Sequence, residues 1–264
     1  MDLRGKTGVP AWQHGPPQER PDPASIECDL QRAFGSASRQ LVGERGREIV
    51  TAGVPCQHVF QLKSGLACRQ RPLPEGGQAI LDLCRPGDFI GLESLFFASA
   101  LDTVLALTNV SYLALDHAGL NRLMQQPKIA LQLMRHMAEG KERVETVAIL
   151  VGQLKARERT AALLGFLWRR LRPASGRAAT GENQAGLPFT QKQLAEYLGL
   201  NVIHLNRVLS RLRNSGALKF RRGTIIVKDL PQLEQIAGAT HGLLHSQPSA
   251  TEGPAVPIAA LLRI

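Results

Sequence analysis

The sequence predicts an α+β protein with an N-terminal antiparallel β domain, a long central helix and a C-terminal winged helix. Short apolar runs separated by Gly/Pro turns occupy residues 47–116, and a helical seven-residue repeat starts near residue 128. A helix-turn-helix pattern followed by two short strands occupies residues 187–227. The expected segments are a disordered arm (1–25), the β domain (26–126), a dimerisation helix (127–155), a winged helix-turn-helix domain (156–230) and a C-terminal tail (231–264).

The composition excludes several classes of protein. The chain has 264 residues, of which 44% are hydrophobic, which is enough for one or two globular domains and too many for wholesale disorder. It contains no apolar run near the ~18 residues of a membrane span, and residues 1–23 lack the apolar core of a secretory signal. The four cysteines are too few for a disulfide scaffold. We therefore expect a cytoplasmic protein without a membrane partner.

The net charge of +10 is concentrated in one segment. Residues 155–228 contain 15 Lys and Arg against three acidic residues, a net of +12, so the rest of the chain has a net charge of −2. This asymmetry indicates a module that binds a polyanion, with nucleic acid as the first candidate. The alternative is an ordinary solvated surface.

The β domain is predicted from short runs of apolar residues and from the turns between them. Turn residues occur at 63–65, 74–77 and 85–88. The predicted strands cover residues 48–50, 58–62, 66–68, 78–83, 102–107 and 110–115. Many short strands at this spacing are typical of an antiparallel sandwich or barrel.

The central helix carries apolar or small residues at alternating spacings of four and three. This seam consists of Leu133, Met137, Gly140, Val144, Val147, Val151 and Leu154. Such a repeat is the pattern by which one helix packs along another, so we expect the seam to be a dimer interface. The alternative is a helix that packs on its own domain, since the repeat spans only three heptads.

The most informative pattern lies towards the C-terminal end. Thr190 suits the N-cap of a helix that ends at Gly199, where a left-handed conformation is favourable. Ala195, Gly199 and Leu205 have the spacing of a helix-turn-helix, in which a small residue permits a close crossing, glycine makes the turn and an apolar residue fills the angle. A second helix over residues 202–214 and a hairpin with a basic tip complete a winged helix.

The outward face of this second helix supplies the candidate DNA contacts. Base contacts are expected from Arg207, Asn206, Ile203 and Val202. Arg207 suits guanine O6 and N7, Asn206 an adenine edge or a phosphate, and Ile203 a thymine methyl group. Phosphate contacts are expected from Thr190, Lys192, Asn201, His204, Arg211, Arg221 and Arg222. The alternatives are that Arg207 caps its helix or pairs with Glu196, and that His204 is merely solvated.

Two stretches of the chain carry a family resemblance. One contains Glu75-Gly76-Gly77-Gln78-Ala79-Ile80-Leu81-Asp82 and the turn Arg85-Pro86-Gly87-Asp88, and the other runs from Ala156 to Arg207. They resemble the β-roll, the linker helix and the recognition helix of the Crp/Fnr family of bacterial transcription regulators, in its FixK/Fnr-like branch. The resemblance implies a cyclic-nucleotide-binding-like β-roll, a homodimer, a palindromic double-stranded DNA operator and contact with RNA polymerase.

The chain departs from the cyclic-nucleotide-binding members of this family. Those members hold the phosphate with an arginine and a serine after a Gly-Glu-Leu run. Here the stretch is Gly91-Leu92-Glu93-Ser94, and no Lys or Arg occurs between Pro86 and Asn121. Because a buried phosphate without a cation is costly, we expect no binding of cAMP or cGMP.

The chain also departs from the iron–sulfur members. Cys28, Cys56, Cys68 and Cys84 lie 28, 12 and 16 positions apart, without the short spacing that such clusters favour. We therefore expect no metal and no cofactor, with Cys68 and Cys84 as core residues. Cys28 or Cys56 as exposed redox thiols is an alternative.

The sensor side of the resemblance leaves further alternatives open. Haem ligation through His58, His117 or His136 is one, although a lone histidine is more often structural. The broader alternative is a ligand- or redox-dependent regulator whose effector is not cAMP.

The recognition helix departs from the family pattern, and the sequence lacks the common catalytic motifs. Several family branches carry a glutamate where this chain has Ile203, and here Asn206 precedes Arg207, so we expect a different operator base at the position that the glutamate would read. The sequence has no nucleophile elbow, no His-Glu-x-x-His run and no phosphate-binding glycine loop. We therefore expect no catalytic residues and no enzymatic activity.

Overall fold

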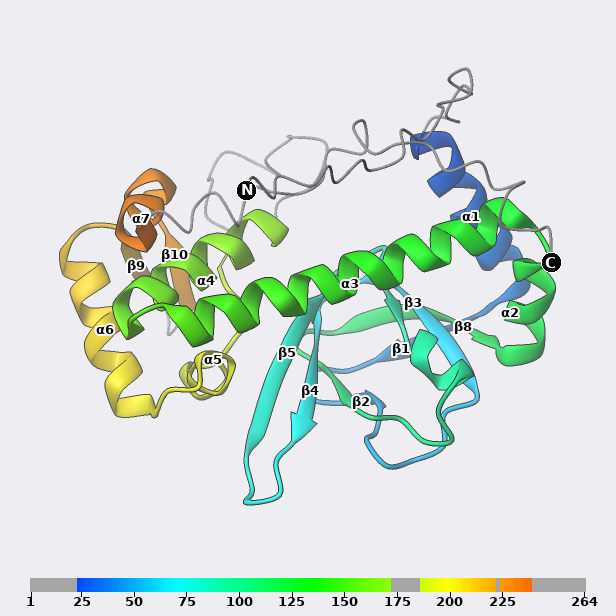
Figure 1. Ribbon diagram of the computed structural model, residues 1–264, viewed down its shortest axis with the longest axis horizontal. Helices are drawn as coiled ribbons and strands as arrows, with labels where there is room; N and C mark the ends of the chain where they lie inside the picture. The colour runs from blue at the N-terminus through cyan, green and yellow to red at the C-terminus, as the bar shows by residue number, and fades with distance from the viewer. Residues whose placement is uncertain (1–22, 172–185, 222–223, 239–264) are drawn as a thin grey trace, which may run out of the picture.

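The computed structural model describes residues 23–171, 186–221 and 224–238 of the chain. Figure 1 shows a β domain beneath the long helix α3 and a smaller, mainly helical domain at the far end of that helix. The predicted α+β class and the order of its three parts are confirmed.

Two four-stranded antiparallel sheets form the β domain. The first has the order β1 (Arg39–Gly43), β8 (Val110–Asp116), β3 (His58–Ser64) and β6 (Phe89–Ile90). The second has the order β2 (Glu48–Val50), β7 (Thr103–Ala106), β4 (Ala67–Pro72) and β5 (Gln78–Cys84). A short 3-10 helix, η1 (Leu92–Leu95), follows β6. Residues alternate between the two faces of each strand, so Leu62, Ala67 and Val104 meet in a buried core between the sheets.

Three helices cover the outer face of the first sheet. Figure 1 shows α1 (Pro23–Ala37) and α2 (His117–Met124) beside the N-terminal part of α3 (Pro127–Gln153). Phe34 of α1 and Leu120 of α2 pack with Val59 of β3 and Leu133 of α3 in one buried cluster. The β domain therefore holds the first half of α3 firmly.

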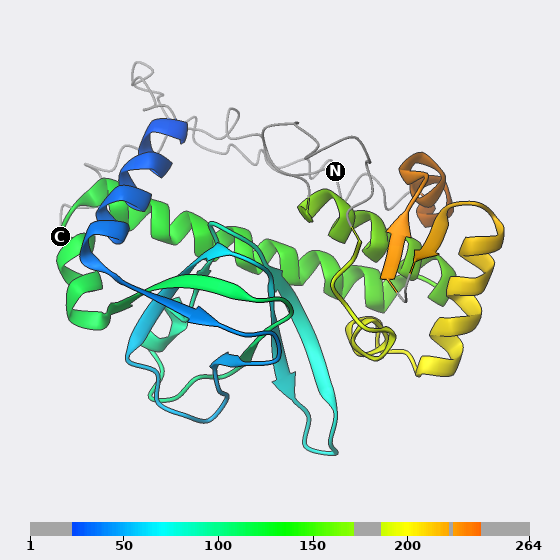
Figure 2. The same cartoon turned by 180° about the vertical axis from the view of Figure 1, so that it is seen from behind.

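The winged-helix domain follows α3 and is seen from behind in Figure 2. It consists of α4 (Ala156–Leu171), α5 (Gln191–Leu198), α6 (Val202–Asn214), β9 (Leu218–Arg221), β10 (Thr224–Val227) and α7 (Leu230–Ala237). Strands β9 and β10 pair antiparallel, with Phe220 opposite Ile225, and Gly186 forms a bridge to Ile226. The helix predicted over residues 202–214 matches α6, and α4 opens the segment expected to form the winged-helix domain.

Two predicted boundaries are wrong. Residues 23–25 begin α1 rather than end a disordered arm, because α1 continues into Leu30 and Phe34, which are buried in the β domain. Residues 231–237 lie in α7 rather than in a tail, because Leu233 and Ala237 are buried in the winged-helix domain. The rest of the predicted arm (1–22) and of the predicted tail (239–264) lies outside the described residues, as do residues 172–185 of the winged-helix segment.

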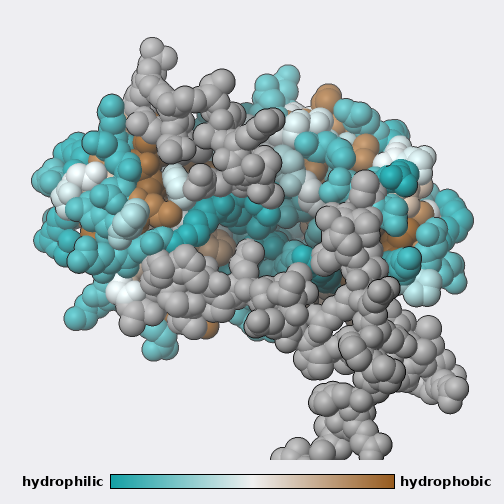
Figure 3. Space-filling view, turned by 90° about the horizontal axis from the view of Figure 1, so that it is seen from above, coloured by the Kyte–Doolittle hydropathy of each residue, from teal (hydrophilic) through white to brown (hydrophobic). Residues whose placement is uncertain are grey.

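The described surface gives no sign of a membrane-spanning element. Seen from above, it is mostly hydrophilic, and the hydrophobic residues form small separate patches (Figure 3). Across the three described ranges, no helix combines the length and the apolarity that crossing a bilayer requires. Most apolar residues of the two sheets are instead buried, although Val42 of β1 is 75% exposed.

Two turn glycines give a matched test of the β domain. Gly65 has φ +80°, and a methyl group added there would collide with the carbonyl oxygen of Asn109. Gly76 has φ +88° but faces open space, so Gly76→Ala adds only the backbone strain of a left-handed residue, about 1–2 kcal/mol. We expect Gly65→Ala to lower the free energy of unfolding by clearly more, as measured by urea denaturation. Equal losses in the two variants would contradict this packing.

Candidate nucleic-acid interface

Helix α5 begins and ends at its capping residues. The Thr190 hydroxyl accepts a hydrogen bond from the Gln193 backbone N–H, and Gln193 Oε1 accepts one from the Thr190 N–H at 2.9 Å, which forms a capping box. Gly199 ends the helix with φ 59° and ψ 39°, which turns the chain into α6. Ala195 and Leu205 are buried at the crossing of the two helices. The helix-turn-helix predicted from these residues is confirmed.

Helix α6 separates a buried face from an exposed one. Its N-cap residue, Asn201, accepts a hydrogen bond from the His204 N–H at 2.7 Å. The inner face buries Leu205, Val208, Leu209 and Leu212. The outer face of α6 exposes Val202, Ile203, His204, Arg207, Ser210 and Arg211. Arg207 forms no ion pair within the described part of the chain, and Glu196 lies 3.9 Å from Lys192.

The four predicted base-contact residues differ in accessibility. Ile203 is 68% exposed, and Arg207 and Val202 are also exposed. Asn206 is only half exposed, and its Oδ1 is buried without a hydrogen-bond partner among the described residues. A bidentate contact to adenine needs both the oxygen and the nitrogen of the amide. In this rotamer Asn206 cannot make that contact, which leaves Arg207 and Ile203 as the stronger candidates.

Five of the predicted phosphate-contact residues surround the outer face of α6. Lys192, His204 and Arg211 are exposed, with basic or polar ends free to reach solvent. Thr190 and Asn201 lie at the N-termini of α5 and α6, where they cap the helices. Backbone N–H groups at a helix N-terminus favour a phosphate, so these caps suit the role through their position.

The wing hairpin is tied to α6 by a cation–π contact. The guanidinium of Arg213 lies 5.9 Å from the centroid of the Phe220 ring. Arg213 is therefore engaged with the wing rather than with the outer face of α6. Of the two predicted contacts at the tip of the wing, Arg222 lies outside the described residues, and only the backbone of Arg221 is described.

The seam predicted on α3 faces mainly the chain's own domains. Leu133 is 3% exposed and packs with α1 and α2, and Val147 is 7% exposed and packs in the core of the winged-helix domain. The prediction of a dimer interface is wrong for these two residues, because a buried side chain has no surface left for a second copy. Of the other members of the seam, Met137 is 44% exposed, and Gly140, Val144, Val151 and Leu154 are partly exposed.

A second stripe of α3, displaced from the predicted seam by one residue, is free. This outer stripe consists of Leu131, Met134, Ala138, Lys141, Glu145, Ala148 and Gly152. It keeps the alternating spacings of three and four, and Met134 is 64% exposed. Ile149 lies beside it and is also exposed. Helix α3 thus keeps a partly apolar face that no described residue covers.

The β domain and α3 enclose a cavity of about 350 Å³. Its three arginines are already paired with carboxylates of the same chain. Asp102 lies 2.7 Å from Arg71 and 3.8 Å from Arg69, and Asp82 lies 2.9 Å from Arg143. The cavity therefore offers no unpaired guanidinium among the described residues, which fits a cyclic phosphate poorly.

The serine after the Gly91-Leu92-Glu93 run is also engaged within the protein. Ser94 is buried, and its hydroxyl donates a hydrogen bond to the Gly91 carbonyl at 2.6 Å. The same hydroxyl lies 2.8 Å from His117 Nε2. The residues of this segment therefore do not fit the cyclic nucleotide that the β-roll of the family implies.

The cysteines do not fit an iron–sulfur cluster. Cys68 and Cys84 lie on neighbouring strands but belong to different cores. Burial raises the pKa of Cys68 to about 12 and also raises that of Cys84, as is usual for thiols enclosed in apolar cores. The Cys56 thiol donates to the His58 carbonyl at 3.2 Å, and the side chain of Cys28 lies outside the described residues. Across the described ranges, no three His, Cys, Asp or Glu residues group as metal ligands.

The histidines considered for haem contact aromatic or polar neighbours. His58 stacks with Phe60 at 6.2 Å between ring centroids, and His136 lies 4.9 Å from Phe89. His117 contacts Ser94. These contacts suit structural roles.

Comparisons with known proteins match both domains. The Crp-like helix-turn-helix domain matches residues 158–236, and the cyclic nucleotide-binding domain matches residues 42–127. The "Anaerobic regulatory protein" of Pasteurella multocida is 27% identical over 81% of this chain and 77% of its own length. The "Fumarate and nitrate reduction regulatory protein" of Escherichia coli K12 is 24% identical over 82% of this chain and 86% of its own. The structure of FixK2 from Bradyrhizobium japonicum superposes with a TM-score of 0.67 at 24% identity, and it covers 76% of this chain and 98% of its own.

The two matched domains together span more than half of the chain. They correspond to the two folded domains at either end of α3. The chain therefore belongs to the Crp/Fnr family of transcription regulators.

Proposed function

We propose that the protein is a homodimeric, sequence-specific regulator that binds a palindromic operator through α6 in the cytoplasm and contacts RNA polymerase. The observation that carries the proposal is the outer face of α6, which presents Arg207 and Arg211 on a helix whose opposite face is buried. A helix of this kind fits the major groove, where base edges are distinguishable. The net charge of +12 over residues 155–228 favours the phosphate backbone around it.

Within this interface the two arginines have different roles. Arg207 lies one turn into α6 and binds a guanine edge, while Ile203, one turn earlier, contacts a thymine methyl group. Arg211, a further turn along, contacts phosphate. The operator then differs from that of relatives with a glutamate at the position of Ile203, because isoleucine cannot accept a hydrogen bond from cytosine N4.

The dimer forms along the outer stripe of α3. This stripe has the spacing of a coiled-coil seam, and its Leu131 and Met134 side chains are exposed. A two-fold axis along α3 presents two copies of α6 to one duplex, and a palindromic operator with half-sites about 34 Å apart, one turn of B-DNA, is the DNA that such a dimer fits.

A second candidate is a regulator that responds to a small molecule other than cAMP. The cavity of about 350 Å³ beside α3 favours it, since its volume is in the range of ligand pockets. The two candidates differ in one measurement, which is whether the purified protein binds its operator without any additive. Binding without additive supports the effector-independent regulator, and binding only with a cell extract's small-molecule fraction supports the second candidate.

The assignment of Arg207 can be tested on an operator selected from random duplexes. Arg207→Ala should weaken operator binding by about 1–3 kcal/mol and relax specificity at one base pair of each half-site, because it removes a bidentate base contact. Arg211→Ala is the matched control, and it should weaken binding to all sequences alike and lower the salt slope by about one. Fluorescence anisotropy on operator variants at several salt concentrations measures both effects. Weakening by Arg207→Ala that is equal for all sequences would show a phosphate contact instead.

The assignment of the outer stripe can be tested by charge. Met134→Glu combined with Ala148→Glu should give monomers by light scattering, since the stripe would then carry like charges across the two-fold axis. The far-UV circular dichroism should stay unchanged, because both residues are exposed. Val147→Glu, the control on the buried face, should instead destabilise the fold. A dimer of unchanged mass in the double variant would place the interface elsewhere.

A further inference from the structure

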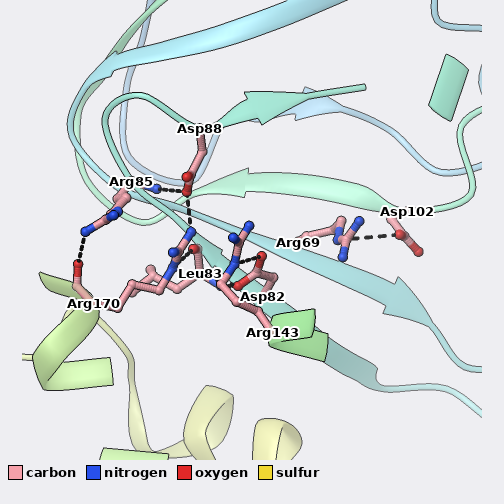
Figure 4. Close-up of polar contacts among 8 residues, drawn as sticks. All are labelled: Arg69, Asp82, Leu83, Arg85, Asp88, Asp102, Arg143 and Arg170. Carbon is pink, nitrogen blue, oxygen red and sulfur yellow. Dashed lines mark hydrogen bonds and ion pairs between the residues drawn. The ribbon is translucent and has the colours of Figure 1, made fainter. Parts of the chain in front are cut away.

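A buried cluster of charged side chains joins the winged-helix domain to the β domain. This Arg170 cluster consists of Asp82, Arg85, Asp88, Arg143 and Arg170 (Figure 4). The side chains of Asp82 and Arg170 are only 6% and 8% exposed. The members come from β5, the turn after it, α3 and α4, so the cluster connects both domains and the helix between them.

Arg170, in the last turn of α4, makes most of the contacts across the domain boundary. Its Nε donates to the Leu83 carbonyl at 2.8 Å, and its Nη2 donates to Asp88 Oδ2 at 2.5 Å. Asp82 Oδ1 lies 3.9 Å from the same Nε. In return, Arg85 Nη1 donates to the Arg170 carbonyl at 3.0 Å. The planar guanidinium holds its Nε and Nη2 donors at a fixed separation that a lysine ammonium, a single point charge, does not reproduce, so lysine is no full equivalent here.

Asp82 extends the same connection to α3. Its Oδ2 accepts a hydrogen bond from Arg143 Nε at 2.9 Å, and its Oδ1 accepts one from the Leu83 N–H at 2.8 Å. Burial lowers the pKa of Arg143, but the Asp82 and Asp88 carboxylates raise it by more, so the guanidinium stays charged. Loss of any one partner would leave an uncompensated buried charge.

An apolar core continues across the boundary beside this cluster. Ile80 and Leu83 of β5 belong to the same buried cluster as Leu167 of α4 and Tyr197 of α5. Burial raises the pKa of Tyr197 well above its usual value, and the Asp82 carboxylate raises it further. The contacts of α4 and α5 with β5 therefore combine apolar packing with directional ion pairs.

This docked arrangement leaves the outer face of α6 uncovered. Ile203 is 68% exposed, and Arg207 and Arg211 are exposed as well. The side chains that form the boundary with the β domain come from α4 and α5, not from this face. The cluster is therefore compatible with DNA bound to α6, since none of the described residues covers this face.

We propose that Arg170 is a positioning residue for operator binding, which sets the orientation of α6 on the β domain and thereby the spacing of the two α6 helices in the dimer. The inference rests on the proposed function. Two α6 helices held at a fixed distance accept one spacing between half-sites, whereas helices on loosely held domains accept several. The orientation then needs no small molecule, because the chain's own carboxylates hold it.

The test compares four full-length proteins: the wild type, Arg170→Gln, Arg170→Lys and Arg169→Gln. Arg169 is the matched control, because it lies next to Arg170 on α4 but pairs with Glu234 inside the winged-helix domain. Anisotropy measures binding to the selected palindrome, to versions with one or two base pairs inserted or removed between the half-sites, and to a single half-site.

We expect the wild type and Arg169→Gln to lose about tenfold or more in affinity when the spacing changes. Arg170→Gln should bind the single half-site as the wild type does, bind the original palindrome about tenfold more weakly, and lose its preference for spacing. Arg170→Lys should recover part of the preference, since it keeps the charge. Equal weakening on half-site and palindrome, with the spacing preference intact, would show a merely structural role and overturn the proposal.

A second variant keeps the test decisive if Arg170→Gln does not fold. Asp88→Asn removes a carboxylate from the β-domain side and leaves the winged-helix domain unaltered, and the same loss of spacing preference is expected. A retained preference in this variant overturns the proposal, as does tighter operator binding by either variant, which would mean that the cluster restrains the domain. A wild-type protein that binds no duplex would contradict the proposed function instead.

Discussion

Helix α3 must pack against two domains and still keep one face free, and this constraint governs the organisation of the chain. Its first half is held through Leu133 against α1 and α2, and its second half through Val147 against the winged-helix core. With 27 residues at about 1.5 Å each, the helix is about 40 Å long. It acts as a rod between the domains, and no described residue covers the outer stripe along its length. A rotation of α3 about its axis would disturb the packing of both domains at once, so such rotations are unfavourable.

The Arg170 cluster supplies a second connection between the domains, so that α3, α4 and β5 are each linked to the other two. The winged-helix domain is joined to α3 through the chain, α3 to Asp82 through Arg143, and Asp82 to α4 through Arg170. Buried ion pairs seldom add stability over apolar residues of the same volume, but they penalise every arrangement in which a charge loses its partner. A cluster at a domain boundary therefore contributes mainly to a single defined geometry, which is what a regulator that reads two half-sites at a fixed distance requires.

Local signals were enough to predict the winged helix, and long-range contacts were not. Thr190, Gly199 and Leu205 lie within one short stretch, and each acts through its own capping or packing preference, so α6 was predicted at its observed ends. On α3 the helical period was predicted correctly, but two members of the predicted dimer seam, Leu133 and Val147, are buried against the chain's own domains. A heptad pattern shows that a helix has an apolar face but not what covers it, and Leu133 is covered by its own chain. The pairing of Asp82 with Arg170 spans 88 positions in the sequence, and no local sequence pattern predicts it.

The charged residues of the cavity also take part in the orientation of the winged-helix domain. A phosphate-binding site offers a cation that is unpaired before the ligand binds. Here the arginines of the cavity are already paired with Asp82 and Asp102. Asp82 belongs to both the cavity wall and the Arg170 cluster, so any anion that displaced it from Arg143 would also disturb the contact that orients α4. A ligand can shift an equilibrium only through its different affinity for the two states. In the described state the arginines are paired with the chain's own carboxylates, and no described residue covers the outer face of α6. An anionic ligand that competes for these arginines could therefore only weaken the docking of the two domains.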